Sequence, residues 1–219
     1  FMKKSLVALA FGTLALGIAE FVMMGILPDV ARSLGISIPE AGHLISAYAI
    51  GVCCGAPMLV VAYKYPLKNM LLVLACIILL GSTLAAFSVN YWMLLVARFI
   101  SGLPHGAYFG VASIVAVRLA ERHKTGAVSI MVAGMTVANL FGVPLATGLS
   151  STLSWRFPFV LVMFVSLIVL YYIWKWVPGV GALPDNGFRH QFAFLKKDAP
   201  WLILAATMLA NGGIFCWYS

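Results

Sequence analysis

Long apolar stretches follow one another almost without interruption through this chain of 219 residues. Hydrophobic residues make up 63% of the sequence and charged residues 9%, whereas about a quarter of the residues in a soluble domain are charged. A soluble fold cannot bury so much apolar surface, but a bilayer accommodates about 20 apolar residues per spanning helix. We predict spans at Ser5–Leu27, Ala41–Tyr63, Met70–Phe87, Tyr91–Leu119, Ala127–Leu149 and Phe157–Val177, and a seventh that begins at Trp201. The sequence therefore indicates an all-α polytopic membrane protein.

The basic residues lie almost entirely on one side of these spans. Eleven of the 14 Lys and Arg residues fall before span one, between spans two and three, after span four, or between spans six and seven. The exceptions are Arg32 and Arg156 on the opposite side and Arg98 inside span four. Cytoplasmic loops are enriched in Lys and Arg, so this distribution predicts a cytoplasmic N-terminus. It also accounts for the net charge of +8 without a nucleic-acid partner.

The sequence divides into three parts. We predict a six-helix transmembrane bundle over residues 1–177 and a cytoplasmic linker, rich in Gly, Pro and charged residues, over 178–200. Residues 201–219 would begin a second half with a truncated seventh helix. No polar flank follows Ser219, so we expect the chain to be part of a longer protein.

Spans one to three and spans four to six have opposite predicted topologies, as inverted repeats require. Gly55 and Pro57 lie about two-thirds along span two, and Gly142 and Pro144 lie at the equivalent depth of span five, which enters from the other face. A two-fold axis in the membrane plane would give this arrangement. Coincidence is the alternative, because Gly and Pro are common in transmembrane helices.

Small residues recur at four-residue spacing in three spans. The sets are Gly51 and Gly55; Gly102, Gly106 and Gly110; and Gly134, Ala138, Gly142 and Ala146. Each set forms a smooth stripe on one helix face, which predicts close packing against a neighbouring helix. The stripes would have a conformational role only if helices slide along them.

One acidic residue, Glu20, lies inside span one. A charge in the bilayer costs several kcal/mol unless it faces a cavity or a partner, so Glu20 is a candidate functional residue. Arg98 lies seven residues into span four from the same outer side, and we expect the two side chains at similar depth. Burial favours the neutral acid, whereas a nearby guanidinium favours the carboxylate, so Glu20 could exchange a proton. The alternative is a static ion pair that holds spans one and four together.

Four further residues are candidates for contact with a solute. His105 shares a helix face with Arg98 and could bind solute, titrate, or hydrogen-bond a backbone carbonyl. Asn139 in span five could bind a polar ligand or bridge two helices. Tyr48 could present its hydroxyl to a cavity or serve in packing, and Met24 could line an adaptable pocket or fill a gap.

Sequence motifs for other chemistries are absent or weak. There is no phosphate-binding loop for ATP and no metal-ligand spacing, and the four cysteines lie scattered in apolar spans. The stretch Gly110–Ser113 is similar to part of an intramembrane serine protease, but no catalytic His faces it in the predicted arrangement. We therefore expect no enzyme activity, no metal and no cofactor.

The chain resembles the major facilitator superfamily over Ser5–Ser219, in the proton-antiporter branch of drug and sugar efflux proteins that includes the bacterial arabinose efflux permease. The resemblance rests on these stretches: Gly17–Phe21, Gly25–Pro28, Gly51–Pro57, Arg98–Gly106 and Gly134–Pro144. It implies the first six helices of a twelve-helix fold with alternating access, and a missing C-terminal half as the main partner. Arg98 matches the arginine of helix four that is associated with proton coupling, and Glu20 matches an acidic position of helix one.

One departure from this family concerns the loop after span two. The family places an Asp before the basic residues there, and this acid helps to lock the outward-facing state. Here Lys64 and Lys68 remain but the acid is missing, so the lock must be absent or built differently.

The resemblance and the buried acid together predict a proton-coupled exporter of a small sugar or drug-like solute in the bacterial inner membrane. It would act as a monomer and use the proton gradient as its energy source. A passive facilitator and, less favoured, an intramembrane enzyme are the alternatives.

Overall fold

The computed structural model describes residues 2–61, 64–120, 123–182 and 198–218, and within these ranges every regular element is a helix. The chain separates into two compact units, residues 1–183 and 184–219. Each unit is described by itself. The finer division into bundle, linker and second half stays a prediction, and most of the predicted linker lies outside the described residues.

Helix α1 (Met2–Leu34) is the longest helix of the bundle. The prediction that this helix ends before Pro28 is wrong, because Pro28 lies inside it. Helix packing continues past the proline, where Val30 is fully buried, and this compensates for the lost backbone hydrogen bond. The helix ends where Gly35 adopts a left-handed φ of 64° and the Ile36 amide donates to the Ala31 carbonyl.

The second predicted span is divided into two helices. Helix α2 (Ile38–Gly55) begins with a capping box, in which the Ser37 and Glu40 side chains each bond the other's backbone amide. The helix ends at Gly55, and α3 (Met58–Val61) follows after Pro57. Pro57 lacks an amide hydrogen, so it cannot extend the hydrogen-bond ladder of α2.

Spans four and five are also irregular. The fourth is divided at Leu103 into α5 (Tyr91–Gly102) and α6 (Pro104–Leu119). The fifth runs from α7 (Lys124–Val137) through a π-helical turn, η2 (Ala138–Gly142), into α8 (Val143–Thr152). The third and sixth spans are the continuous helices α4 (Leu67–Ala86) and α9 (Phe157–Trp176). The sequence did not predict the π-turn.

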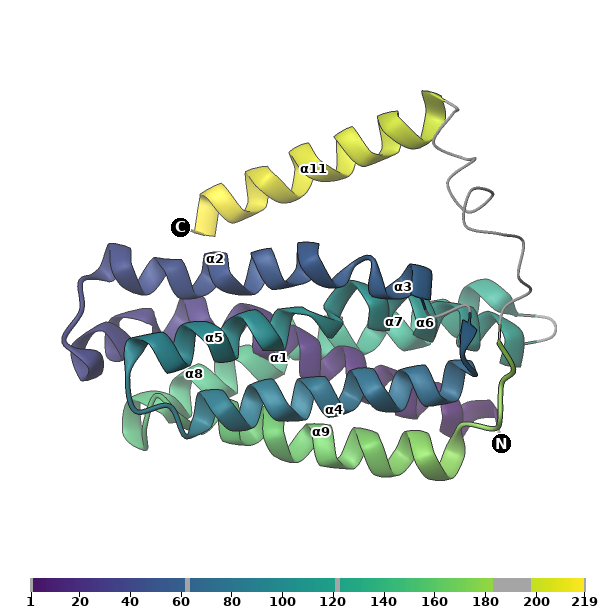
Figure 1. Cartoon of the computed structure of the whole chain (residues 1–219), viewed down its shortest axis with the longest axis horizontal. Helices are drawn as coiled ribbons and strands as arrows, with labels where there is room; N and C mark the ends of the chain where they lie inside the picture. Colours follow the sequence, from purple (N-terminus) through teal and green to yellow (C-terminus); the bar gives the residue numbers. More distant parts are fainter. Residues whose placement is uncertain (1, 62–63, 121–122, 183–197, 219) are drawn as a thin grey trace. The chain divides into compact units, whose positions relative to one another are not determined.

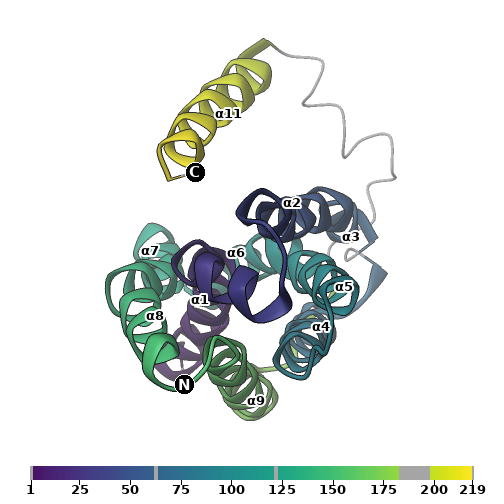
Figure 2. The ribbon, with the colours of Figure 1, turned by 90° about the vertical axis from the view of Figure 1, so that its left-hand side faces the viewer.

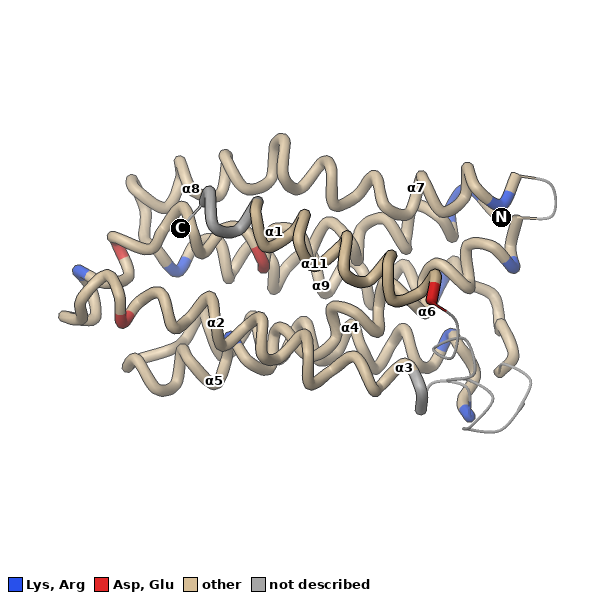
Figure 3. The backbone as a smooth tube through the Cα atoms, turned by 90° about the horizontal axis from the view of Figure 1, so that it is seen from above, with Lys and Arg blue, Asp and Glu red and all other residues tan. Residues whose placement is uncertain are grey.

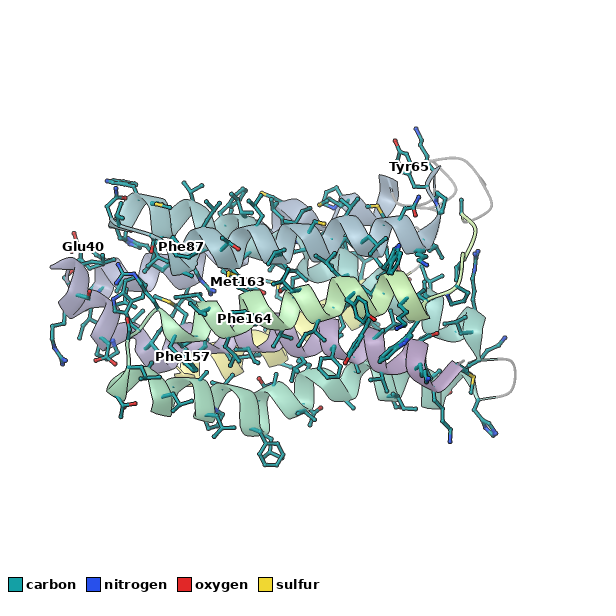
Figure 4. All side chains as sticks on the ribbon, turned by 90° about the horizontal axis from the view of Figure 1, so that it is seen from below. Glu40, Tyr65, Phe87, Phe157, Met163 and Phe164 are labelled. Carbon is teal, nitrogen blue, oxygen red and sulfur yellow. The ribbon has the colours of Figure 1, made fainter. Side chains whose placement is uncertain are left out.

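The helices Met2–Leu34, Leu67–Ala86, Tyr91–Leu119, Lys124–Thr152 and Phe157–Trp176 are long and apolar enough to cross a membrane, by length and composition. The interrupted second span is not among them. Glu40 and Tyr65 lie at opposite ends of the bundle (Figure 4). Lys and Arg gather at the end where the N-terminus lies, in agreement with the charge asymmetry of the sequence (Figure 3).

Helix α1 runs through the middle of the bundle and contacts helices on every side of it (Figures 1 and 2). The most extensive contacts between helices form matching pairs. Span two packs on span four (α2 on α5), and span five packs on span one (α7 on α1). Likewise α4 packs on α5 and α9 on α1, while α4 and α9 pack on each other. Exchange of spans one to three with spans four to six reproduces every one of these contacts, as an inverted repeat requires.

Glycine stripes lie at both of the matched interfaces. A Cβ at Gly51 would overlap the Phe99 carbonyl of α5, and a Cβ at Gly55 would overlap the Leu103 carbonyl between α5 and α6. A Cβ at Gly134 would overlap the Ala10 carbonyl of α1. At Gly102 it would meet the backbone of α2. Gly106 differs, since no described atom lies within 4 Å of a Cβ placed there. Close packing through small residues is thus observed at four of these five positions.

The second unit contains helix α11 (Asp198–Tyr218). It begins close to the predicted start of span seven at Trp201. Its described side chains, from Asp198 to Gly213, are exposed apart from the half-buried Pro200.

Candidate functional site

Glu20 lies on α1 with its side chain 17% exposed, inside the bundle rather than on its outer surface. Its Oε2 atom is 3.8 Å from Nε2 of His105, which lies in the first turns of α6 and is 14% exposed. The first and fourth spans therefore meet at this acid, but through a histidine.

The other ring nitrogen of His105 faces α2. Nδ1 is 2.9 Å from the hydroxyl oxygen of Tyr48, which is only 3% exposed. The His105 ring also stacks on Phe109, one turn further along α6, with 5.3 Å between ring centroids. These contacts hold the imidazole in one orientation between Tyr48 and Glu20.

Arg98 of α5 is 1% exposed and joins three helices. Its Nη1 donates a hydrogen bond to the Ala19 carbonyl of α1, and its Nε donates to the Leu44 carbonyl of α2 at 3.4 Å. The guanidinium carbon lies 4.5 Å from the centroid of the Tyr48 ring, in a cation–π contact. Arg98 thus holds the backbone of α1 at the residue just before Glu20.

Glu20 and Arg98 lie close enough for electrostatic coupling but form no ion pair within 4.0 Å in the described part of the chain. Within the same residues, Oε2 of Glu20 and Nη2 of Arg98 are buried without a hydrogen-bond partner. A direct ion pair that holds spans one and four together is therefore not what the structure shows. The acid keeps an oxygen available for a further partner.

The helix face predicted from the spacing of Arg98, Gly102 and His105 is present despite the break at Leu103. All three residues face Tyr48: Arg98 lies over its ring, Gly102 packs against its carbonyl oxygen, and His105 bonds its hydroxyl. Tyr48 is therefore the centre of the cluster, which consists of Glu20, Tyr48, Arg98 and His105. The sequence had suggested either a cavity or a packing role for Tyr48, without placing it at the centre of a cluster.

Other candidate residues lie apart from this cluster. Asn139 is exposed on the π-turn η2, and no contact between it and the cluster is observed among the described residues. Met24 is half-buried on α1, one turn beyond Glu20. Pro144 is exposed in the first turn of α8. Contact of Asn139 or Met24 with a solute stays a prediction.

Two cations at the basic end of the bundle bind backbone carbonyls. Nζ of Lys68 donates to the Trp174 carbonyl near the end of α9 at 2.7 Å, and Nη1 of Arg118 donates to the Gly181 carbonyl at 2.8 Å. The amide of Leu67 at the start of α4 donates to the Val180 carbonyl at 3.0 Å. Residues 177–182, which follow α9, are thus hydrogen-bonded to the start of α4 and to the end of α6, and none of these bonds involves an acidic side chain. Lys64 is exposed and also has an interaction partner.

Sequence reasoning missed three members of the site. Phe109 follows His105 by four residues, so helical spacing could have identified it. The carbonyl groups of Ala19 and Leu44 could not have been found, because backbone acceptors have no signal in side-chain identity.

Comparison with known proteins gives the family. Residues 9–219 match the model of the Major Facilitator Superfamily. The chain is 47% identical to AraJ of Escherichia coli (strain K12) over 220 residues, which covers all of this chain and 56% of that protein. It is 30% identical to the chloramphenicol resistance protein of Streptomyces lividans, over 98% of this chain and 56% of that one. A protein of Helicobacter pylori (strain P12) named for sugar efflux is also 30% identical, over 98% of this chain and 54% of that one.

Solved structures agree on the fold. The peptide transporter POT with bound sulfate gives a TM-score of 0.69 at 17% identity, over 95% of this chain and 47% of that one. A bacterial homologue of the lysosomal transporter Spinster, inward-facing and unoccupied, gives 0.67 at 18% identity, over 91% and 50%. The chain spans about half the length of the curated relatives it matches. Its family and fold are those of membrane transporters rather than enzymes, and the chain belongs to the Major Facilitator Superfamily.

Proposed function

We propose that the transporter containing this chain exports a small solute in exchange for protons, by alternating access across the bacterial inner membrane. The basic end of the bundle would face the cytoplasm, in line with the excess of Lys and Arg in cytoplasmic loops. A second half would close the central cavity.

The observation that supports this proposal is the position of Glu20. It is an acid inside a membrane-spanning bundle, partly accessible, with one buried oxygen that has no hydrogen-bond partner among the described residues. Intramembrane acids of this kind mark ion or substrate pathways. Its neighbours Arg98 and His105 would then decide how readily the proton leaves.

Export follows from competition between solute and proton. When the cavity opens to the outside, Glu20 takes up a proton and the solute leaves. When the cavity opens to the cytoplasm, the proton leaves and the solute binds, with Asn139 and Met24 as further contacts. A ligand that binds one state better than the other shifts the conformational equilibrium, which is what coupling requires.

The solute class proposed is a sugar or a drug-like molecule. Two relatives are named for sugar efflux and for chloramphenicol resistance, and both share 30% of their aligned residues with this chain. A ligand-stabilisation screen of sugars against drug-like compounds, on the complete transporter, would separate the two.

The function is tested in inverted membrane vesicles that contain the complete transporter. We expect solute uptake to depend on the imposed pH gradient and to lose this dependence in Glu20→Gln. Glu40→Gln is the matched control, since Glu40 is fully exposed at a helix start, and it should leave coupling unchanged. Coupling in Glu20→Gln equal to wild type would overturn the assignment. Uptake by the wild type that ignores the gradient would instead identify a passive facilitator.

A further inference from the structure

His105 connects two groups through its two ring nitrogens. Nδ1 is 2.9 Å from the Tyr48 hydroxyl, and Nε2 is 3.8 Å from the Glu20 carboxylate. A neutral imidazole has one N–H, so its two nitrogens have opposite hydrogen-bonding roles. The group that bonds one nitrogen therefore fixes which role the other nitrogen takes.

The Tyr48 hydroxyl has one hydrogen-bond acceptor for its proton among the described residues. The hydroxyl is buried, and among the described residues the hydrogen-bond partner of that hydroxyl is Nδ1 of His105. If Nδ1 were the donor, the tyrosine proton would have no acceptor inside the bundle, and an unsatisfied buried donor costs about 1–3 kcal/mol. The Arg98 guanidinium, 4.5 Å from the ring centroid, also makes the phenol a better donor by drawing electron density from the ring. The Tyr48 hydroxyl is thus the donor and Nδ1 the acceptor.

We propose that Tyr48 is a positioning residue for proton exchange, which holds His105 in the tautomer whose Nε2–H faces Glu20. In this tautomer Nε2–H stabilises the carboxylate and cannot accept a hydrogen bond from the protonated acid. Tyr48 thereby makes Glu20 release its proton at a lower pH than it would beside an unconstrained histidine. This inference rests on the proposed function, in which Glu20 is the group that exchanges the proton.

The cluster contains the titratable groups that face His105 from each neighbouring helix: Glu20 from α1, Tyr48 from α2 and Arg98 from α5. Tyr108, next on α6, faces away and donates to the Leu9 carbonyl of α1 at 3.4 Å. The other described charged or titratable residues of these four helices lie near helix ends or on exposed faces: Lys3, Lys4, Asp29, Arg32, Glu40, His43, Cys53, Cys54, Tyr91 and Arg118.

The first experiment compares Tyr48→Phe with wild type in proton-coupled transport by the complete transporter. This change removes the hydroxyl but keeps the ring against which Arg98 lies. His105 can then turn an unprotonated Nε2 toward Glu20 and accept a hydrogen bond from the protonated acid, which stabilises the protonated form. The pH at half-maximal coupled transport should therefore rise by about half to one unit. Tyr108→Phe is the matched control, because it also removes a buried tyrosine hydroxyl, and its midpoint should not move.

The second experiment reads the tautomer directly in the wild type, so it does not depend on whether a variant folds. Nitrogen-15 NMR of the histidine-labelled transporter in lipid, with His105 assigned by its loss in His105→Asn, should show a protonated Nε2 and a bare Nδ1. Tyr48→Phe should show a protonated Nδ1 population.

The outcomes separate the two proposals. A protonated Nδ1 in the wild type, or an unchanged midpoint in Tyr48→Phe, overturns the role of Tyr48 while coupling through Glu20 still stands. Full coupling in Glu20→Gln overturns the proposed function, whatever the tautomer.

Discussion

A graded series of Gly→Ala substitutions tests whether the matched helix interfaces depend on small residues. At Gly106 a new Cβ would meet no described atom within 4 Å. At Gly142 it would lie 2.8 Å from Cγ1 and 2.9 Å from Cδ1 of Ile18, at the movable end of a side chain. At Gly51 it would overlap the Phe99 carbonyl oxygen of α5 and lie 3.2 Å from the Cα of Gly102, which are backbone atoms.

The expected change in the free energy of unfolding depends on which atoms must move to make room for the new Cβ. Alanine improves intrinsic helix stability by up to about 1 kcal/mol over glycine, and at Gly106 no described atom of the bundle opposes this gain. At Gly142 the Ile18 side chain can rotate away, so the gain in helix propensity and the cost of moving Ile18 nearly cancel. At Gly51 two helix backbones must separate, and such overpacking costs about 1–3 kcal/mol, which exceeds the gain from helix propensity.

The assay is thermal or denaturant unfolding of the complete transporter in one detergent, with the three variants compared side by side. Stability should fall in the order Gly106→Ala, Gly142→Ala, Gly51→Ala, with the last below wild type. Because the entropy of unfolding grows with chain length, the shift per kcal/mol in the complete transporter should be smaller than the roughly 2–4 °C of a 150–250-residue domain. If Gly51→Ala is as stable as Gly106→Ala, then α2 and α5 are not held at backbone contact and the reasoning is wrong.

Two further predictions concern the ends of the bundle. The Glu40 carboxylate accepts bonds from the Ser37 hydroxyl and amide, which lower the pKa of Glu40 below its ordinary 4.5. This stabilisation is complete above pH 4.5 and is lost as the pH falls through the lowered pKa. Amide exchange at Ser37, corrected for intrinsic rates, should therefore accelerate at low pH relative to Met93, whose amide donates to the neutral Asn90 side chain. Arg118→Gln should remove the bond to the carbonyl of Gly181 and raise amide exchange in the segment after α9 by roughly tenfold, with Lys124→Gln unchanged as the control. Equal exchange in both variants would show that the segment is held by other contacts.

The sequence predicted the helices well because apolar length is a strong signal. The bounds of α9 differ from the prediction by a single residue at one end, and the inverted repeat predicted from Gly55 and Gly142 is reproduced by the helix contacts. The errors lie where tertiary packing overrides local preference. The apolar span was predicted to end at Leu27, but α1 continues to Leu34 because its last turns stay packed.

The candidate site was predicted in part of its composition, but its connectivity was not predicted. Glu20, Arg98 and His105 were expected near one another from depth and spacing, and they meet in one cluster. The sequence suggested that Arg98 would act on Glu20 directly. Instead Arg98 binds backbone carbonyls and Tyr48, because a buried guanidinium needs several acceptors and nearby carbonyl groups supply them. Acceptors of that kind are invisible in a sequence.

The tie between α4, α6 and the segment after α9 has a consequence for genetics. Its acceptors are main-chain oxygens of Trp174, Val180 and Gly181, so a substitution at any of these residues leaves the acceptor atom in place. Only a change at Lys68 or Arg118 removes a side-chain donor. Random mutagenesis would therefore find that these residues tolerate substitution, although their main-chain bonds connect α4, α6 and α9.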